Sequence, residues 1–424
     1  MSEIITRPRG TQDFLPDKAE LLHFVNESAV SFFEKYGFRA IVTPTFEKEE
    51  LFKRSIGEST DIVQKEMYEF KDKAGRKLAL RPEGTASVVR AYIENNMAAM
   101  PRPVKLFYTG QMFRYERPQA GRYREFWQMG AEAIGSAEPA LDAEVIELCF
   151  SYLSSLGIKD LILKINSMGC RECRPDYIKE LRQFLRGKEG QFCKTCAQRI
   201  DLNPLRVFDC KNENCSKALA EAPKIADYIC EEDKEHFKKV RSYLDLVGIT
   251  YELDPHLVRG FDYYTRTTFE VLLPGLGSQN ALAGGGRYDY LVADYGGPKE
   301  PAIGFAFGTE RIILALEVQK ITVFTKPEPD VFVAWVEEAQ KLPAFKALSI
   351  LRDKHLKAGM AYDAKNLKAQ LKMADKLQAR TALIIGEEEV QTGKCTLKYL
   401  ESGKQKKLSL EEIIKELKLS SYHN

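Results

Sequence analysis

Hydrophobic and polar residues alternate along two runs in the first third of the chain. The first run covers residues 105–114 and the second covers residues 124–132. Alternation with a period of two is typical of strands that bury one face, and the loop between the runs is rich in Arg, Glu, Pro and Gly. The pattern therefore predicts a hairpin with a long polar tip.

Helical periodicity and short apolar runs predict further elements around this hairpin. A helix is expected from an N-cap at Asp17 to about residue 36, followed by an edge or interface strand at 38–44, since Pro44 lacks an N–H donor. Residues 78–92 predict a strand, a turn and a helix. Additional predictions are a helix at 140–156, strands at 161–166, 251–254 and 268–272, a glycine turn opening a helix at 284–289, and a strand from 302 leading into a helix at 312–318.

The composition of the chain changes twice. From residue 169 to about residue 230 the chain is charged, helical in pattern and holds most of the cysteines, which indicates an insertion. A boundary is expected near residues 325–329. Beyond it, strands at 330–335, 361–363 and 382–386 alternate with helices at 344–359 and 367–377, which predicts a small α/β domain with a largely parallel sheet. The Lys-rich tail at 404–418 is expected to be a solvated face.

Charge and composition limit the class of protein. The 424 residues carry a formal charge of +2, so any nucleic-acid partner must be held by local patches rather than by a basic field over the whole molecule. The sequence has no 18-residue apolar run, and its first residues lack the apolar core of a signal peptide. We therefore expect a cytoplasmic protein that does not enter membranes. In that compartment its nine cysteines favour metal ligands or buried thiols over disulfides.

Two clusters of polar residues are candidates for ligand binding. The hairpin tip gathers arginines and aromatic residues, namely Arg114, Arg117, Arg122 and Arg124 with Tyr115, Tyr123 and Phe126. Planar cations beside aromatic faces suit phosphate and a flat heterocycle, and so a nucleotide. At the start of the helix near residue 85, Glu83, Gly84 and Thr85 combine a carboxylate with free backbone N–H groups, although an ordinary helix cap would have the same residues.

The cysteine spacing is compatible with zinc in more than one arrangement. Cys170, Cys173, Cys193 and Cys196 form two Cys-x-x-Cys pairs, as in tetrahedral zinc sites. Cys210 and Cys215 offer a competing second half for Cys193 and Cys196. Reduced thiols packed in a small insertion are the alternative to any metal, and the sequence leaves these interpretations open.

Four stretches taken together resemble histidyl-tRNA synthetases, which are class II aminoacyl-tRNA synthetases. They are RPRGTQDFLP, FRYERPQAGRYREFWQMGAE, LVRGFDYYTRTTFEV and AIGFAFGTER, and the run LKAQLKMADKLQARTALIIGEEE is similar to the family's anticodon-binding domain. The resemblance covers nearly the whole chain and implies an α+β fold. A catalytic domain at 1–325 would have an antiparallel sheet, flanking helices and the insertion at about 169–230, and an α/β anticodon-binding domain would follow at 326–424.

The resemblance also implies a reaction and a site. ATP and L-histidine would give histidyl-adenylate, and the histidyl group would pass to the 3′ end of histidine tRNA. Arg114 and Arg259 are implied as the catalytic cations. The histidine site would comprise Glu83, Gly84, Thr85, Arg114, Gln128, Glu132, Arg259, Tyr263 and Tyr264, and the ATP site Arg114, Arg122, Arg124, Phe126 and Arg311. Mg²⁺ would accompany ATP.

The family resemblance further implies a homodimer, with the segment around Pro44 at its interface. In the C-terminal domain, Lys365, Lys368, Lys372 and Lys376 recur along one helix and suit either tRNA phosphates or a solvated face. The competing interpretation is the related regulatory subunit of ATP phosphoribosyltransferase, which keeps the fold without charging tRNA. It typically lacks the C-terminal domain and departs in the catalytic stretches, whereas here that domain and Arg114, Arg259 and Arg311 are all present.

Overall fold

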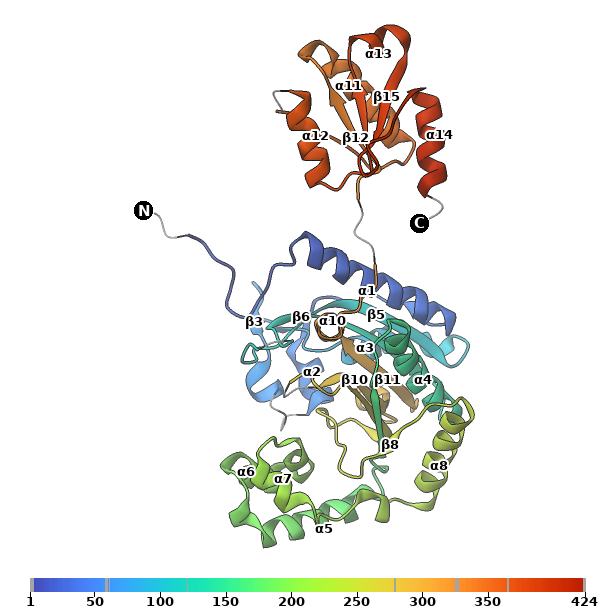
Figure 1. Cartoon of the computed structure of the whole chain (residues 1–424). Helices are drawn as coiled ribbons and strands as arrows, with labels where there is room; N and C mark the ends of the chain where they lie inside the picture. The colour runs from blue at the N-terminus through green and yellow to red at the C-terminus, as the bar shows by residue number, and fades with distance from the viewer. Residues whose placement is uncertain are drawn as a thin grey trace. The chain divides into compact units, whose positions relative to one another are not determined.

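The structure of the protein is a computed structural model that describes residues 4–57, 60, 62–119, 121–277, 280–324, 328–363 and 366–421. The chain divides into two compact units, Met1–Phe324 and Thr325–Asn424, and each is described by itself (Figure 1). None of the described helices combines the length and the hydrophobicity that crossing a membrane requires.

The larger unit is built on an eight-stranded sheet with the order β1-β5-β6-β11-β10-β9-β7-β8. Its strands are β1 (Arg39–Ala40), β5 (Val104–Phe113), β6 (Glu125–Ile134), β7 (Ile162–Ser167), β8 (Glu252–Leu253), β9 (Thr265–Leu272), β10 (Ala281–Arg287) and β11 (Ala302–Gly308). Neighbours are antiparallel except at the two edges, where β1 runs parallel to β5 and β8 runs parallel to β7. The α+β class, the antiparallel sheet and the hairpin, which is β5 with β6, are confirmed.

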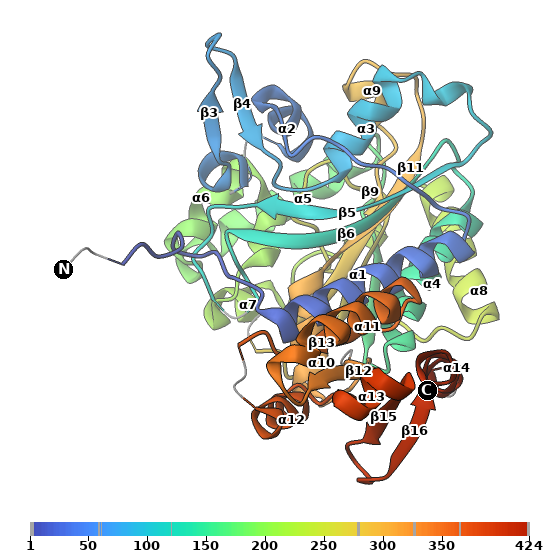
Figure 2. The same cartoon turned by 90° about the horizontal axis from the view of Figure 1, so that it is seen from above.

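Each face of this sheet is covered by helices. Phe107 of β5 joins a core formed with α1 (Pro16–Lys35), α4 (Pro139–Ser155), α8 (Glu231–Leu246) and α10 (Thr309–Val318). Its neighbours Leu106 and Tyr108 point to the opposite side and pack with α3 (Thr85–Glu94) and α9 (Leu291–Asp294). Figure 2 shows α1 running alongside β5 and β6. Alternate residues of β5 are therefore buried in two separate cores, one on each face of the sheet.

A second, three-stranded sheet with the order β2-β4-β3 lies before the hairpin in sequence. Its elements and their neighbours are β2 (Phe46–Lys48), β3 (Glu69–Lys71), β4 (Lys77–Leu80), α2 (Glu49–Ile56), the π-helix η1 (Ile62–Glu66) and the 3₁₀-helix η2 (Met97–Ala99). The end of β4 leads directly into α3, as predicted for residues 78–92.

Three predictions for this unit differ from the structure. The first helix begins at Pro16 after Leu15, so Asp17 lies in the first turn and is not the cap. The strand expected at 38–44 is only Arg39–Ala40, although it does lie at a sheet edge. The glycine turn expected at 284–289 was wrong, because Gly284 to Gly286 are paired residues inside β10.

The insertion folds around its own small core. It contains α5 (Arg174–Gly187), η3 (Glu189–Gln191), α6 (Lys194–Leu202), η4 (Pro204–Asp209), α7 (Glu213–Leu219) and η5 (Ile225–Asp227). Tyr177, Leu181 and Leu185 of α5 pack there with Cys196 and Cys215. The helical insertion is therefore present as predicted.

The smaller unit is a five-stranded sheet with the order β13-β12-β14-β15-β16. Its elements are β12 (Val331–Trp335), η6 (Glu338–Gln340), α11 (Lys341–Asp353), β13 (Ala358–Met360), α12 (Leu367–Lys376), β14 (Thr381–Ile385), α13 (Glu387–Thr392), β15 (Lys394–Tyr399), β16 (Gln405–Ser409) and α14 (Leu410–Ser421). The first three strands in this order are parallel and the other two pairings are antiparallel, so the sheet is mixed.

The expectations for this unit were correct in outline and wrong in three details. The sheet was expected to be largely parallel, whereas two of its four strand pairings are antiparallel. The strand expected at 361–363 lies at Ala358–Met360, because α11 already ends at Asp353. The Lys-rich tail forms β16 and α14, and its Ile413 and Leu417 are buried in the core. The tail is therefore part of the fold, and only its lysine-bearing side is solvated. The predicted Lys365 lies outside the described residues.

Candidate active site

A cavity of about 310 Å³ opens among the β4–α3 turn, the β5–β6 hairpin, residues 258–264 and strands β9 to β11. Most of the side chains singled out in the sequence line it: Glu83, Thr85, Arg114, Arg122, Phe126, Gln128, Glu132, Arg259, Tyr263, Tyr264 and Arg311. Segments separated by more than 200 residues in sequence therefore contribute to one site.

Of the residues implied for the histidine and ATP sites, Gly84 and Arg124 do not line this cavity, and neither do Tyr115 and Arg117 of the hairpin tip. Gly84 lies against Tyr108, whose ring atoms come within 2.2 Å of the position of a Cβ built on the glycine. The guanidinium of Arg124 lies 3.7 Å from the ring centroid of Tyr115, and its Nη1 donates to the carbonyl of Arg9 at 3.4 Å. Arg124 thus fixes the N-terminal segment, and of the pair Arg122 and Arg124 only Arg122 reaches the cavity.

Two buried carboxylates form one part of the wall. Glu83 accepts hydrogen bonds from the backbone N–H groups of Thr85 at 2.6 Å and Ala86 at 2.9 Å, which caps α3. Glu132 accepts from Thr85 Oγ1 at 2.6 Å and from the hydroxyl of Tyr288. Burial raises the pKa of Glu83, and it raises the pKa of Glu132 to about 8 in spite of these donors.

Aromatic side chains surround the carboxylates. The ring centroids of Tyr263 and Tyr264 lie 4.7 Å apart, and that of Tyr288 lies 5.6 Å from Tyr263. Tyr108 donates to Gln128 Oε1 at 3.3 Å. Burial raises the pKa of all four phenols, so they stay protonated and can donate hydrogen bonds. Carboxylates and phenols together form a pocket suited to a small ligand with its own N–H groups.

Arg259 is positioned by strands β9 and β10. Its Nη1 lies 2.6 Å from Glu270 Oε1 on β9, and its guanidinium lies over the backbone of Gly284 on β10. Among the residues that the structure describes, its Nε is buried without a hydrogen-bond partner. An unpaired buried donor on a cation is costly unless an anionic ligand completes it.

The remaining arginines line the same cavity as Phe126. The guanidinium of Arg114 lies 5.3 Å from the Phe126 ring centroid, and its Nε donates to the carbonyl of Pro82 at 2.9 Å. Arg122 Nη1 lies 2.8 Å from Glu116 Oε2. Burial lowers the pKa of Arg311 to about 10, and the charge of Arg122 acts in the same direction. This concentration of positive charge beside an aromatic ring suits a polyphosphate with a planar base.

Sequence reasoning missed several contributors to this site. Tyr288 lines the cavity and escaped notice because the residues before it were taken for a turn. Tyr108 was assigned to a strand without a role. Gly304 leaves the space in which the Glu132 carboxylate sits, since a Cβ there would overlap Glu132 Oε2. No signal in a single sequence would have paired those two residues.

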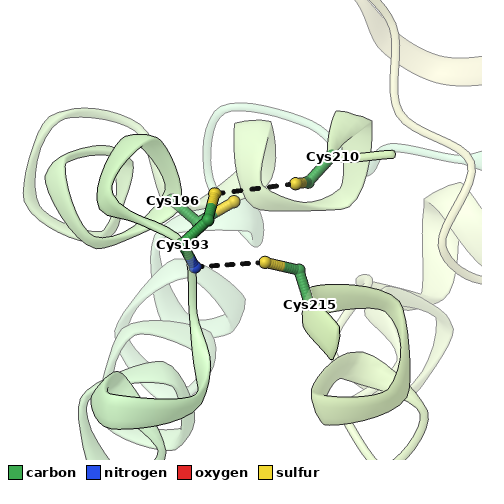
Figure 3. Close-up of side chains that lie close together, drawn as sticks. All are labelled: Cys193, Cys196, Cys210 and Cys215. Atoms are coloured by element: carbon green, nitrogen blue, oxygen red, sulfur yellow. Dashed lines mark hydrogen bonds between the residues drawn. The ribbon is translucent and has the colours of Figure 1, made fainter. Parts of the chain in front are cut away.

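The structure separates the cysteines of the insertion into two groups. Cys193, Cys196, Cys210 and Cys215 have their sulfur atoms within 4.8 Å of one another (Figure 3). Cys170 and Cys173 instead join Cys230 and Asp233. The grouping of Cys170 and Cys173 with Cys193 and Cys196 is therefore not what the fold brings together, because α5 separates the two pairs in the insertion. The competing set named from the sequence is the one found.

Comparison with known proteins agrees with this geometry. The family model described as "Histidyl-tRNA synthetase" matches residues 10–312, and the one described as "Anticodon binding domain" matches residues 330–419. The chain is 48% identical to a histidine--tRNA ligase of Halothermothrix orenii and 47% identical to that of Natranaerobius thermophilus. These alignments cover 97% of this chain in both cases, and 99% and 98% of the relatives.

A solved structure gives the same result for the fold. The crystal structure of apo S. aureus histidyl-tRNA synthetase superposes with a TM-score of 0.83 at 37% identity, covering 98% of this chain and all of that one. The matches extend over both units, and the residues of the cavity fall within the first matched range. The chain belongs to the histidyl-tRNA synthetase family.

Proposed function

We propose that this cavity activates L-histidine with ATP and that the enzyme then transfers the histidyl group to the 3′ end of histidine tRNA. The observation that carries the proposal is the meeting of buried carboxylates and phenols with four arginines in one cavity. The first group suits the amino acid and the second suits the nucleotide. Their proximity is what a reaction between the two substrates needs.

The chemistry explains the arginines. The histidine carboxylate attacks the α-phosphorus of ATP, and negative charge accumulates around that centre in the transition state. Arg114 and Arg259 both line the cavity and supply fixed cations there. Pyrophosphate then leaves, and the carboxylate oxygen remains bonded to the α-phosphorus as the mixed anhydride.

ATP occupies the arginine-lined part of the cavity in this proposal. Phe126 and Arg311 hold the adenine between them, because a flat ring stacks on both an aromatic face and a guanidinium plane. Arg122 exchanges its bond with Glu116 for the outer phosphates. Mg²⁺ enters with ATP as part of the substrate and shares the triphosphate charge. The proposal leaves Arg124 with the N-terminal segment rather than with ATP.

Histidine occupies the carboxylate-lined part. Glu83, Thr85 and Gln128 receive the α-ammonium group, while Glu132, Tyr263 and Tyr264 bind the imidazole. An imidazole ring both donates and accepts hydrogen bonds, so a ligand without those groups leaves buried partners unpaired and is rejected. Gly84 contributes by its size, since it lets Tyr108 approach the start of α3.

The other parts of the chain are assigned to tRNA and assembly. The unit from residue 326 onward would bind the anticodon, where Lys368, Lys372 and Lys376 are exposed along α12. The insertion would contact the acceptor arm, and two copies would associate through the region of β1. The reaction would take place in the cytoplasm, with histidine tRNA as the macromolecular partner.

The regulatory-subunit alternative is not favoured. It would not need the cations that meet at this cavity, and it typically lacks the C-terminal domain that this chain has. The two functions differ in whether the protein activates an amino acid at all.

The test is ATP–pyrophosphate exchange with each of the standard amino acids, followed by charging of histidine tRNA. Exchange with histidine alone, lowered roughly 10²-fold or more in Arg259→Ala, is the expected result. Arg76→Ala, which removes an exposed arginine paired with Asp72, is the matched control and should keep wild-type exchange. Absence of exchange with every amino acid in the wild-type protein would reject the proposed function in favour of the regulatory subunit.

A further inference from the structure

Four cysteines converge at one end of the insertion. Cys193 precedes α6 and Cys196 lies in its first turn, while Cys210 follows η4 and Cys215 lies in α7. All four are free thiols, and their sulfur atoms lie within 4.8 Å of one another. Figure 3 shows the four side chains pointing toward a common centre from three different segments.

The distances match a tetrahedral thiolate site. Zinc–sulfur bonds of about 2.3 Å place the sulfur atoms of a tetrahedron about 3.8 Å apart. The sulfur atoms of Cys193 and Cys210 are separated by 3.9 Å. Backbone N–H groups also point at the cluster, from Cys193 to Cys215 Sγ at 3.3 Å and from Asn212 to Cys210 Sγ at 3.5 Å. Such donors stabilise sulfur atoms that carry negative charge.

The size of the insertion gives a reason for a metal. Its core comprises twelve buried side chains, and a segment of this length buries too little apolar surface to be strongly stabilised on its own. We propose that Cys193, Cys196, Cys210 and Cys215 bind one structural Zn²⁺ ion that holds α6, η4 and α7 together.

The zinc site has a direct connection to the cavity. The segment η4 ends at Asp209, which lines the cavity, and Cys210 follows it immediately. Arg206 of η4 donates to the carbonyl of Gly260, and Asn203 donates to Asp262 Oδ1 at 2.9 Å. The ion therefore fixes the segment that supports the loop carrying Arg259.

The second cluster differs from the first because it contains three cysteines and one carboxylate, that of Asp233. Asp233 Oδ2 accepts from the Cys170 backbone N–H at 2.8 Å and from Cys173 Sγ at 3.3 Å, and Oδ1 lies 2.8 Å from Arg266 Nε. Both oxygen atoms are thus engaged by groups of the protein itself. This cluster is a hydrogen-bonded junction at the base of the insertion, and it serves as an internal control.

The experiment measures metal in the full-length protein purified without chelator, by mass spectrometry of the elements. We expect one zinc per chain in the wild type and in Cys230→Ser, and loss of the zinc in Cys196→Ser and Cys210→Ser. Circular dichroism checks that the variants remain folded. Zinc retained in folded Cys196→Ser, or lost in Cys230→Ser, would overturn the assignment, as would a second equivalent of zinc in the wild type.

Measurements on the wild-type chain alone keep the proposal testable if the cysteine variants do not fold. Protein produced with Co²⁺ in place of zinc should show the charge-transfer and visible absorption of a tetrahedral tetrathiolate cobalt site. Alkylation of Cys193 and Cys210 should be slow until a chelator is added. A wild-type protein that contains no zinc, gives no such spectrum and alkylates rapidly would refute the proposal. Because none of these readouts involves a substrate, their outcome is independent of the proposed function.

Discussion

The guanidinium of Arg259 fills the space directly above Gly284. Its Nη2, Cζ and Nη1 atoms lie 2.3 to 2.5 Å from the position that a Cβ on Gly284 would occupy. Gly284 is paired in the middle of β10, with neighbours on β9 and β11, so its backbone cannot move away. Arg259 can therefore occupy its present position only because residue 284 is a glycine.

Replacing this glycine should separate activity from stability. In Gly284→Ala the new methyl group displaces a long, flexible side chain rather than backbone, so the thermal unfolding midpoint should change little. The displaced guanidinium is misplaced for the transition state, and displacement by about 1 Å can cost on the order of 10²-fold in rate. We expect exchange of histidine with ATP to fall by about that factor.

The matched control is Gly187→Ala at the end of α5, where nothing lies within 4 Å of the new Cβ. It should behave as wild type in both assays. Wild-type exchange in Gly284→Ala would show that Arg259 does not need its present position, and the cation would then lose its proposed catalytic role.

The buried carboxylates should make the ligand-free protein less stable as pH rises. Burial raises the pKa of Glu132 to about 8 and that of Glu310 to about 7, both from an ordinary 4.5. At a pH between the ordinary pKa of 4.5 and each raised pKa, the folded state holds protons that the unfolded state has released. The free energy of unfolding therefore decreases as the pH rises through this interval. Urea unfolding midpoints measured from pH 5 to pH 8 should fall for the wild type, and the slope should be smaller in Glu132→Gln. An identical slope in the variant would contradict the raised pKa.

The sequence was sufficient to predict the strands whose alternation reflects burial. Phe107 and Tyr108 are adjacent and enter different cores, so the period of two in β5 was visible without any structure. The strand β10 was not recognised because Gly284, Gly285 and Gly286 have no side chains to show a period. Two of these glycines make room for other parts of the fold. Gly284 leaves space for the Arg259 guanidinium, and Gly285 leaves space for the neighbouring strand at Gly304.

The site was predictable as a set of residues and not as an arrangement. The family resemblance supplied the arginines and acids that the cavity brings together, but it did not distinguish Arg122 from Arg124. That difference depends on the Tyr115 ring and the Arg9 carbonyl, which hold Arg124 outside the cavity. The grouping of the cysteines likewise depends on the path of α5 and η4, which no spacing rule contains.

The buried ion pair between Arg287 of β10 and Asp142 of α4 predicts a large loss of stability when Arg287 is replaced. Arg287 and Asp142 have fully buried side chains, and Arg287 Nε donates to Asp142 Oδ1 at 3.0 Å while His236 Nε2 lies 2.8 Å from Oδ2. Burial alone would raise the pKa of Asp142, but Arg287 and His236 outweigh it and lower the pKa. Arg287→Met leaves the carboxylate without its main partner, which should cost about 3–5 kcal/mol in the free energy of unfolding.

Chemical denaturation at neutral pH measures this loss, and Arg54→Ala is the control, since Arg54 is exposed and pairs with Glu50 across a helical turn. The control should stay close to wild type. Adding Asp142→Leu to Arg287→Met removes the isolated charge and should restore part of the stability. A single variant as stable as the wild type would show that Asp142 is neutral in the fold.

The contact between Arg206 and Gly260 should affect the binding of histidine more than the binding of ATP. Arg206 also lies 3.0 Å from Asp209 Oδ2, so its guanidinium joins η4 to the residue next to Arg259. Arg206→Ala removes this support while leaving Phe126 and Arg311 untouched. We expect the KM for histidine in the exchange reaction to rise about tenfold, which corresponds to about 1.4 kcal/mol, while the KM for ATP changes much less. Arg186→Ala, which removes an exposed arginine paired with Asp201 in the same insertion, should change neither constant. Equal increases in both constants for Arg206→Ala would mean that the insertion supports the whole cavity and not the loop that carries Arg259.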